Sequence, residues 1–285
     1  MGTCGFSYKD WVGPVYPPAT KPAEMLPRYA RQFPIVEIDS SYYGVPAIAT
    51  VESWARRTPD GFRFTAKAPG TATHAPKPLL GTLHDDVRLF KTNFAPLLRA
   101  EKLACVLLQF PNAFRPGDDS ERHLRTLRDA LDGMPLVAEF RHRDWQTDDT
   151  LRLLRELGIG LVAVDEPQYA SLPRPLTDAT SAIAYVRFHG RNYEQWWKGD
   201  NVSRYDYLYT ADELGPWADR LVDLASQQSV KEVLAFFNNH RRGQAARNAK
   251  MFEAMLATRF PREAIRKAVE QLTEREPEQP PLIEG

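Results

Sequence analysis

The chain has 285 residues, of which 43% are hydrophobic and 26% charged, and its 37 Lys and Arg residues balance its 37 Asp and Glu residues. A chain of this length can bury a large core as one α/β barrel or as two average domains. Zero net charge argues against a general attraction to nucleic acid or to an anionic membrane. Cys4 and Cys105 lack the spacing of metal ligands, so we expect a reduced cytoplasmic protein with buried thiols.

Short apolar runs alternate along the chain with segments of helical periodicity. The predicted strands are residues 3–7, 35–40, 62–68, 103–110, 136–141, 160–165, 183–189 and 233–238. The predicted helices are residues 22–32, 47–57, 82–99, 119–131, 147–157, 211–227 and 243–258. This alternation predicts a parallel sheet closed into a single (β/α)₈ TIM-like barrel. Pro167, Pro173 and Pro175 follow the sixth strand, so the sixth helix should be short or missing.

The two ends of the chain are expected to differ in character. No signal peptide, lipidation site or membrane-spanning run is predicted near the N-terminus. Residues 1–260 should form the barrel domain, because no linker composition interrupts them. Residues 261–285 should be the remnant of a terminal helix followed by a disordered tail rich in Pro and Glu.

The alternation of side chains along each strand predicts which residues face the barrel lumen. Helices cover the outside of such a barrel, so the apolar positions should point outward and the charged positions inward. The charged or ionisable residues that this rule places in the lumen are Glu37, Asp39, Lys67, Glu139, Arg141, Asp165, Arg187 and His189. All lie near the C-terminal ends of their strands, where TIM barrels carry their active sites. A salt-bridge network that only stabilises the barrel is the alternative interpretation.

Two loops add candidates for ligand binding. Residues 190–209 hold Trp196 among several aromatic side chains, which are suited either to stacking on a sugar or base or to packing as a lid. The last predicted helix begins after Arg241 and Arg242, and Arg191 lies in the preceding loop. We expect these arginines to hold an anion together with Arg187 and His189, because barrels of this type often bind phosphate there. A solvated helix start is the alternative for Arg241 and Arg242.

A series of motifs occurs in a fixed order along the chain. They are residues 5–11 (GFSYKDW), 36–43 (VEIDSSYY), 109–111 (QFP), 139–141 (EFR), 185–191 (YVRFHGR) and 237–239 (FNN). In this order they resemble the family called domain of unknown function 72, also described as YecE-like. The resemblance implies a TIM-like barrel without a settled activity. We add the polar and aromatic motif residues Tyr8, Trp11, Tyr42, Gln109, Asn238 and Asn239 to the expected binding site.

The same family looks distantly similar to sugar isomerases and base-excision endonucleases whose barrels bind metals. That similarity would put Glu139, Asp165 and His189 at ligand positions. Arg187 and Asn238, however, stand where the endonucleases carry an Asp and a Glu, and a cation among the ligands opposes metal binding. We therefore expect no tightly bound zinc and no other cofactor. A weak Mg²⁺ or Mn²⁺ site on Glu139 and Asp165 stays open.

These observations leave three functional hypotheses. The favoured one is an enzyme with hydrolase-type or isomerase-type acid–base chemistry on a small sugar-like or phosphate-bearing substrate. Glu37, Glu139 or Asp165 would move protons, while Lys67 and His189 would help to stabilise negative charge. The alternatives are a nucleic-acid binding or processing protein, which zero net charge disfavours, and a non-catalytic sensor of an anionic ligand.

Overall fold

Eight parallel strands line the centre of the molecule in a computed structural model that describes residues 1–74, 82–200 and 202–259. The strands are β1 (Gly2–Thr3), β2 (Ile35–Ile38), β3 (Arg63–Lys67), β4 (Leu103–Phe110), β5 (Leu136–Phe140), β6 (Ile159–Asp165), β7 (Ile183–Phe188) and β8 (Glu232–Phe237). They pair in the order β1-β8-β7-β6-β5-β4-β3-β2. A bridge between Cys4 and Glu37 joins the two edges of this sheet, and the Gly5 N–H donates to the Glu37 carbonyl at 2.8 Å. The predicted TIM-like barrel is confirmed.

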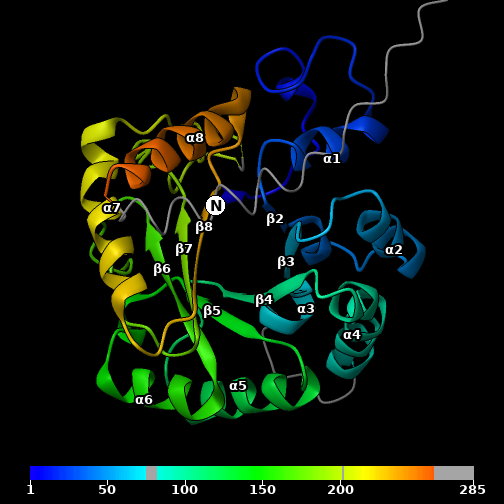
Figure 1. The fold of residues 1–285 in the computed structure, drawn as a ribbon. Coiled ribbons are helices and arrows are strands. Elements are labelled where there is room, and N and C mark those ends of the chain that lie inside the picture. The colour runs from blue at the N-terminus through cyan, green and yellow to red at the C-terminus, as the bar shows by residue number, and fades with distance from the viewer. Residues whose placement is uncertain (75–81, 201, 260–285) are drawn as a thin grey trace, which may run out of the picture.

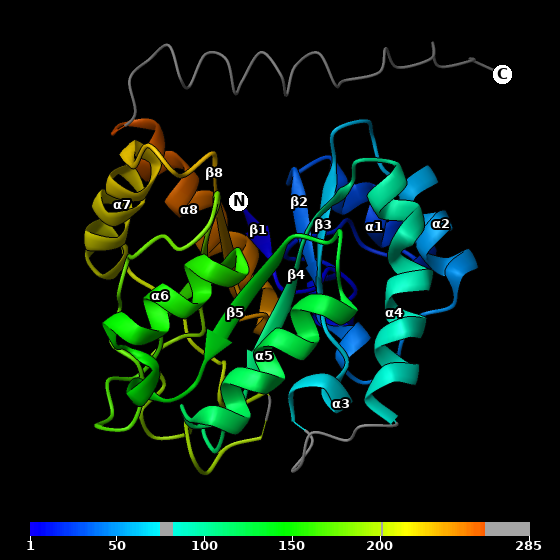
Figure 2. The ribbon, with the colours of Figure 1, turned by 90° about the horizontal axis from the view of Figure 1, so that it is seen from below.

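Helices surround the strands, as Figures 1 and 2 show. They are α1 (Pro22–Ala30), α2 (Ile48–Arg56), α3 (Gly70–Thr73), α4 (Thr82–Arg99), α5 (Asp118–Ala130), α6 (Asp148–Leu157), α7 (Ala211–Ser226) and α8 (Gln244–Ala257). Short 3₁₀ turns are η1 (Lys9–Trp11), η2 (Ser40–Tyr42), η3 (Arg143–Trp145) and η4 (Arg241–Gly243). No helix connects β6 to β7 across the described residues 166–182, as the prolines predicted. The short helix α3 was not predicted.

Capping residues place several helix ends where the sequence predicts them. Thr147 accepts a hydrogen bond from the Thr150 N–H at the start of α6, and Gly158 ends this helix with a left-handed φ of 62°. Thr210 and Glu213 form a capping box at the start of α7. These local signals depend on few residues, and the predicted bounds of both helices therefore differ from the observed ones by only a residue or two.

Two apolar layers separate the strands from their surroundings. The outer layer packs side chains such as Val36, Phe64 and Val186 against the helices. The inner layer fills the lower lumen with Cys4, Ile35, Ala104, Cys105, Leu107, Val137, Val162, Val164, Tyr185, Leu234 and Phe236. Because this layer closes the lumen, any ligand site in the barrel has to lie above it, at the C-terminal ends of the strands.

Two further expectations concern the ends of the chain and the membrane. The predicted terminal helix remnant and disordered tail, residues 261–285, lie outside the described residues. Within the described residues, the helices are too short or too polar to cross a lipid bilayer.

Candidate active site at the C-terminal mouth of the barrel

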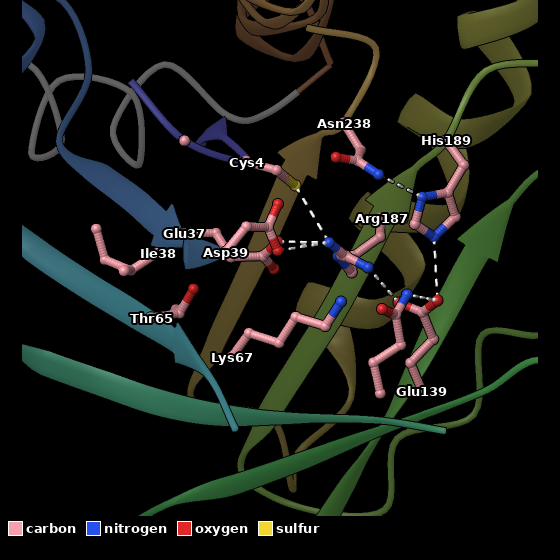
Figure 3. Close-up of polar contacts among 12 residues, drawn as sticks. Cys4, Glu37, Ile38, Asp39, Thr65, Lys67, Glu139, Arg187, His189 and Asn238 are labelled. Carbon is pink, nitrogen blue, oxygen red and sulfur yellow. Dashed lines mark hydrogen bonds and ion pairs between the residues drawn. The ribbon is translucent and has the colours of Figure 1, made fainter. Parts of the chain in front are cut away.

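Arg187 is the centre of the polar cluster above the inner apolar layer (Figure 3). Its Nη1 donates to Glu139 at 2.7 Å and its Nη2 donates to Glu37 at 2.5 Å, and these three side chains are at most 1% exposed. The same Nη2 lies 3.5 Å from Asp39 Oδ1 and 3.5 Å from the Cys4 sulfur. The guanidinium group therefore neutralises buried carboxylates from two other strands.

The Glu139 carboxylate contacts several hydrogen-bond donors besides Arg187. Gln109 Nε2 donates to its Oε1 at 2.7 Å, and Arg141 Nε lies 2.5 Å from the same atom. Burial acts to raise the pKa of Glu139, but Arg141 and Arg187 hold it well below its usual range. Glu139 is therefore ionised at neutral pH, and because it is fully buried beneath its partners it does not reach a substrate directly.

His189 is fully buried between Glu139 and Asn238. Burial, with Arg141 as the next cause, lowers the pKa of His189 to about 3, so the ring is neutral. The Asn238 amide lies 3.1 Å from Nδ1, and Nε2 lies 3.1 Å from Glu139 Oε1. A neutral ring satisfies both contacts when Nδ1 accepts from Asn238 and Nε2 carries the proton. This arrangement makes His189 a fixed hydrogen-bond bridge.

Glu166 is a buried acid that the sequence analysis missed. Its Oε2 accepts from Arg141 Nη1 at 2.8 Å, and its Oε1 has no hydrogen-bond partner among the described residues. Burial raises its pKa to about 8, although Arg141 opposes this shift. Glu166 follows Val162 and Val164 on the lumen side of β6, so the strand alternation could have identified it had the face of β6 been assigned correctly.

The prediction that Asp165 faces the lumen is wrong. Its carboxylate accepts from Tyr209 at 2.6 Å, from Trp217 of α7 at 2.6 Å, and from Arg191 at 2.6 and 2.9 Å. Both faces of β6 are apolar, with Val162 and Val164 on the inner face and Ala163 on the outer one, so polarity did not distinguish the two faces. Because no helix follows β6, polar groups from α7 and the neighbouring loop can reach the outer face at residue 165. Asp165 and Arg191 therefore stabilise the outer wall.

A cavity of about 550 Å³ opens above the Arg187 cluster. Of the predicted site residues, it is lined by Tyr8, Tyr42, Lys67, Gln109, Arg141, Arg187, Trp196 and Asn238. Glu37, Glu139 and His189 contact these lining groups from below. The lining also includes Asp39, Tyr43, His74, Phe110, Pro111, Asn112, Leu172, Trp197, Arg204, Tyr205 and His240. The sequence contained no signal that would single out Arg204, because no motif or strand parity constrains a residue in the middle of a long loop.

The sequence predicts that Arg241 and Arg242 at the start of α8 join the ligand site, but the structure does not place them in the cavity lining. Arg241 forms an ion pair with Asp206, and the backbone N–H of Arg242 donates to Asp10 at 2.6 Å. A Cβ on Gly243 would lie 2.7 Å from Val15, so the N-terminal segment packs against this turn. Neither arginine lines the cavity, and the convergence of both with Arg187 and His189 is not observed.

Trp11 and Asn239 lie just outside the cavity and fix its walls. Trp11 Nε1 donates to the His240 carbonyl at 2.6 Å. Asn239 Nδ2 donates to the Tyr207 carbonyl at 2.7 Å. Both residues are buried and do not line the cavity, so the predicted contact with a substrate is not observed. Their hydrogen bonds hold the loops around the cavity instead.

The sequence left a weak Mg²⁺ or Mn²⁺ site open on Glu139 and Asp165. Glu139 and Asp165 have separate sets of partners on opposite faces of the wall and share no common point. Among the described residues, Cys4, Glu37 and Asp39 do bring ligand atoms within 4.8 Å of one another. The Arg187 guanidinium already lies against all three, and its positive charge opposes a metal ion there.

Comparison with known proteins identifies the family. The family model described as protein of unknown function DUF72 matches residues 1–272. The UPF0759 protein YunF of Bacillus subtilis (strain 168) is 34% identical over 255 residues, which cover 85% of this chain and 90% of YunF. The UPF0759 protein YecE of Escherichia coli (strain K12) is 33% identical over 158 residues, or 52% of this chain and 55% of YecE.

Solved structures agree with this assignment. A DUF72 family protein from Thermotoga maritima MSB8 superposes with a TM-score of 0.80 at 38% identity, covering 90% of this chain and 97% of that one. A DUF72 family protein from Enterococcus faecalis V583 gives a TM-score of 0.79 at 28% identity, covering 90% and 94%. The expected resemblance is confirmed, and the chain belongs to the DUF72 family of uncharacterised proteins.

Proposed function

We propose that the protein is an enzyme that binds a small anionic substrate, sugar-like or phosphate-bearing, in the cavity and converts it by acid–base chemistry of hydrolase or isomerase type. The observation that carries this proposal is the charge of the cavity wall. Lys67, Arg141, Arg187 and Arg204 line it, against Asp39 as its one carboxylate among the described residues. A volume of about 550 Å³ suits a small molecule.

The four lining cations differ in how strongly carboxylates neutralise them. Arg187 contacts Glu37 and Glu139 below the cavity, and Arg141 contacts Glu139 and Glu166. Glu166, with a pKa of about 8, is largely protonated at neutral pH and adds little negative charge. Arg204 forms no ion pair with a described residue, and its buried Nε has no hydrogen-bond partner there. An anion in the cavity would pair with the Arg204 guanidinium without displacing a carboxylate of the described residues.

Asp39 is the group that we assign as general base. It lines the cavity, its side chain is 27% exposed, and its contact with Arg187 is long at 3.5 Å. Glu37 and Glu139 lie beneath the guanidinium and are fully buried, and Asp165 lies outside the barrel wall. A proton-transfer group has to reach the substrate directly or through one water, and Asp39 meets that requirement.

Thermal stabilisation by phosphate and by glucose 6-phosphate tests the binding step. A ligand at about 100 times its Kd stabilises the native state by about 2.7 kcal/mol, which corresponds to a shift in Tm of several degrees for a chain of this size. Arg204→Gln should reduce the affinity about tenfold through loss of one charged hydrogen bond. The control Arg57→Gln changes an exposed arginine that does not line the cavity and should leave the shift intact.

The outcome distinguishes the alternatives as well. Equal shifts in the wild type and Arg204→Gln, or none with either anion at about 10 mM, would refute the cavity as the anion site. Stabilisation without conversion of the sugar phosphate, followed by NMR, would make the protein a ligand sensor. No observation in the cavity favours nucleic acid over a small anion.

A further inference from the structure

Lys67 differs from the two arginines on the cavity floor because it forms no ion pair with a carboxylate of the described residues. It is the last residue of β3, and its amine points towards the Arg187 guanidinium (Figure 3). Nζ forms no hydrogen bond or ion pair with any described residue. Nζ lies over the face of the Tyr42 ring, 4.2 Å from the ring centroid. The amine is thus held in the cavity with its nitrogen accessible.

The backbone around Lys67 is fixed on both sides. Ser41 Oγ donates to the Lys67 carbonyl at 2.6 Å, and the Ala68 N–H donates to the Leu107 carbonyl of β4 at 2.9 Å. A Cβ at Gly70 would lie 3.1 Å from the Tyr42 ring, so the absence of a side chain there lets the ring lie close to the turn after β3. The ring and the strand end therefore orient the lysine side chain in advance of ligand binding.

The surroundings of Lys67 favour the neutral amine more than water does. Burial lowers the pKa of Lys67, and Arg187 adds to this effect, while Asp39, Glu139 and Glu37 oppose it. Two uncharged rings lie on another side of the amine, Tyr42 from η2 and His74 after α3, and their centroids are 5.0 Å apart. A lysine that is desolvated and lies beside another cation is the environment in which lysines act as nucleophiles.

We propose that Lys67 forms an imine with the substrate, which is therefore an aldehyde or ketone that also carries an anionic group. This inference rests on the proposed function, since the anion is the group that Arg204 would hold. The neutral Nζ attacks the carbonyl carbon, and the C–O π electrons move to oxygen. Nitrogen loses a proton and oxygen gains one to give a carbinolamine. The hydroxyl group then gains a proton and leaves as water while the nitrogen loses its second proton, which leaves a C=N bond to Nζ.

Asp39 lines the same cavity and is placed to carry these protons between nitrogen and oxygen. The sequence of steps needs no oxidant or reductant, because it exchanges one carbonyl oxygen for nitrogen and releases water. Once protonated, the imine withdraws electrons from the adjacent carbon, so that proton abstraction or carbon–carbon cleavage beside it becomes easier. Acid–base chemistry at Asp39 would then act on an activated substrate.

Reductive trapping tests this inference directly. The folded protein is incubated at pH 7 with dihydroxyacetone phosphate, or with pyruvate, in the presence of sodium cyanoborohydride, which converts an imine into a stable secondary amine. Mass spectrometry of the intact chain and of its peptides locates the adduct. An exposed lysine with a pKa near 10.4 is neutral in roughly one molecule in 2,500 at pH 7. We expect one adduct per chain at Lys67, formed well before any other lysine reacts.

Two variants and one control make the result specific. Lys67→Met removes the nucleophile at similar volume, and Lys67→Arg keeps the charge but cannot form the imine; both should abolish the adduct. Lys198→Met, which changes an exposed lysine on the loop that covers the cavity, should leave the adduct unchanged. Labelling that spreads equally over exposed lysines such as Lys198, or that persists in Lys67→Met, would overturn the proposal.

The phosphate experiment separates this failure from failure of the proposed function. Phosphate-induced stabilisation of the wild type that is retained in Lys67→Arg, without an adduct at Lys67, would leave the anion site standing and remove the imine. Absence of both stabilisation and adduct would remove both. Glycerol 3-phosphate, which has the anion but no carbonyl, should slow trapping by dihydroxyacetone phosphate, and a lack of competition would show that trapping occurs outside the anion site.

Discussion

Replacing Arg187 by lysine tests whether the central cation is held by the buried carboxylates. Its two terminal nitrogens donate to Glu139 at 2.7 Å and to Glu37 at 2.5 Å. A single ammonium group cannot reproduce both arms of this fork. Arg187→Lys should lose one hydrogen bond to a charged group, worth about 1.5–3 kcal/mol. Desolvation of the carboxylate left behind brings the expected loss of unfolding free energy to about 2–4 kcal/mol. Arg187→Met should cost about 3–5 kcal/mol.

The pH dependence of this loss follows from Glu37. Burial raises the pKa of Glu37 above its ordinary value of 4.5, and Arg187 is the main opposing influence. In the lysine variant the pKa of Glu37 should rise further. A carboxyl group whose pKa is higher in the folded than in the unfolded state destabilises the fold as pH rises above 4.5. The difference between wild type and variant should therefore be smallest near pH 5 and largest near pH 8.

Urea denaturation followed by tryptophan fluorescence at pH 5 and pH 8 measures both quantities. Arg88→Lys is the matched control, because Arg88 pairs with Asp85 on the surface at 79% and 75% exposure. It should change the unfolding free energy by less than about 0.5 kcal/mol. If Arg187→Lys lowers the unfolding free energy at pH 8 no more than Arg88→Lys does, the buried carboxylates do not hold Arg187 as described. A loss that is the same at both pH values would contradict the expected effect of Glu37.

The remaining predictions concern two buried groups with fixed partners. Asp165→Asn should cost about 2–4 kcal/mol of unfolding free energy, because an NH₂ group replaces an oxygen that accepts from Arg191 or Trp217. Phosphate-induced stabilisation of this variant should equal that of the wild type. Loss of that stabilisation would show that Asp165 belongs to the ligand site. His189 has a pKa of about 3 in the folded state, below its ordinary 6.5, so its contribution is present above pH 6.5 and declines by about 2 kcal/mol on going to pH 5. His189→Gln should flatten this decline in urea titrations, and an unchanged slope would contradict the assignment.

The fold could be predicted largely from the sequence because each βα unit carries its own local signals. Apolar runs of strand length alternate with helical periodicity, and prolines after β6 explain the missing helix. Strand parity placed Glu37, Lys67, Glu139, Arg187 and His189 on the lumen side, because the opposite face of each strand is clearly apolar and covered by helices. These five residues do meet in one cluster above the inner apolar layer.

The same rule failed on β6 for a physical reason. The rule assumes that a helix covers each strand, and β6 is the strand after which the helix is missing. Ala163 belongs to the outer apolar layer, and Asp165 continues on its side, where Trp217 of α7 and Tyr209 of the preceding loop donate hydrogen bonds to it. Glu166, one residue later, takes the lumen position. The missing helix after β6 thus explains both the wrong face assigned to Asp165 and the failure to identify Glu166.

Contacts between distant loops could not be predicted from the sequence. The expected anion site needed Arg241 and Arg242 to turn towards the lumen, and both have acidic partners elsewhere, Asp206 and Asp10. Asp206 belongs to no motif, and Asp10 lies in the first motif, more than 200 residues from Arg242, so sequence spacing could not show that these contacts form. The same limit explains Arg204, whose place in the cavity wall depends on how the loop from residues 190 to 209 folds over the barrel.

Stability and ligand binding should therefore depend on different cations of the same cavity. An anion that approaches Arg187 or Arg141 competes with the buried Glu139, which both already contact, so much of their charge is used within the protein. Lys67 and Arg204 have no such partner among the described residues, and a ligand there gains the full interaction. Substitutions of Arg187 should accordingly lower the unfolding free energy, and this loss would mask any effect on ligand binding. Substitutions of Lys67 and Arg204 should leave the fold intact and remove the chemistry, which makes these two residues the ones through which the activity is best sought.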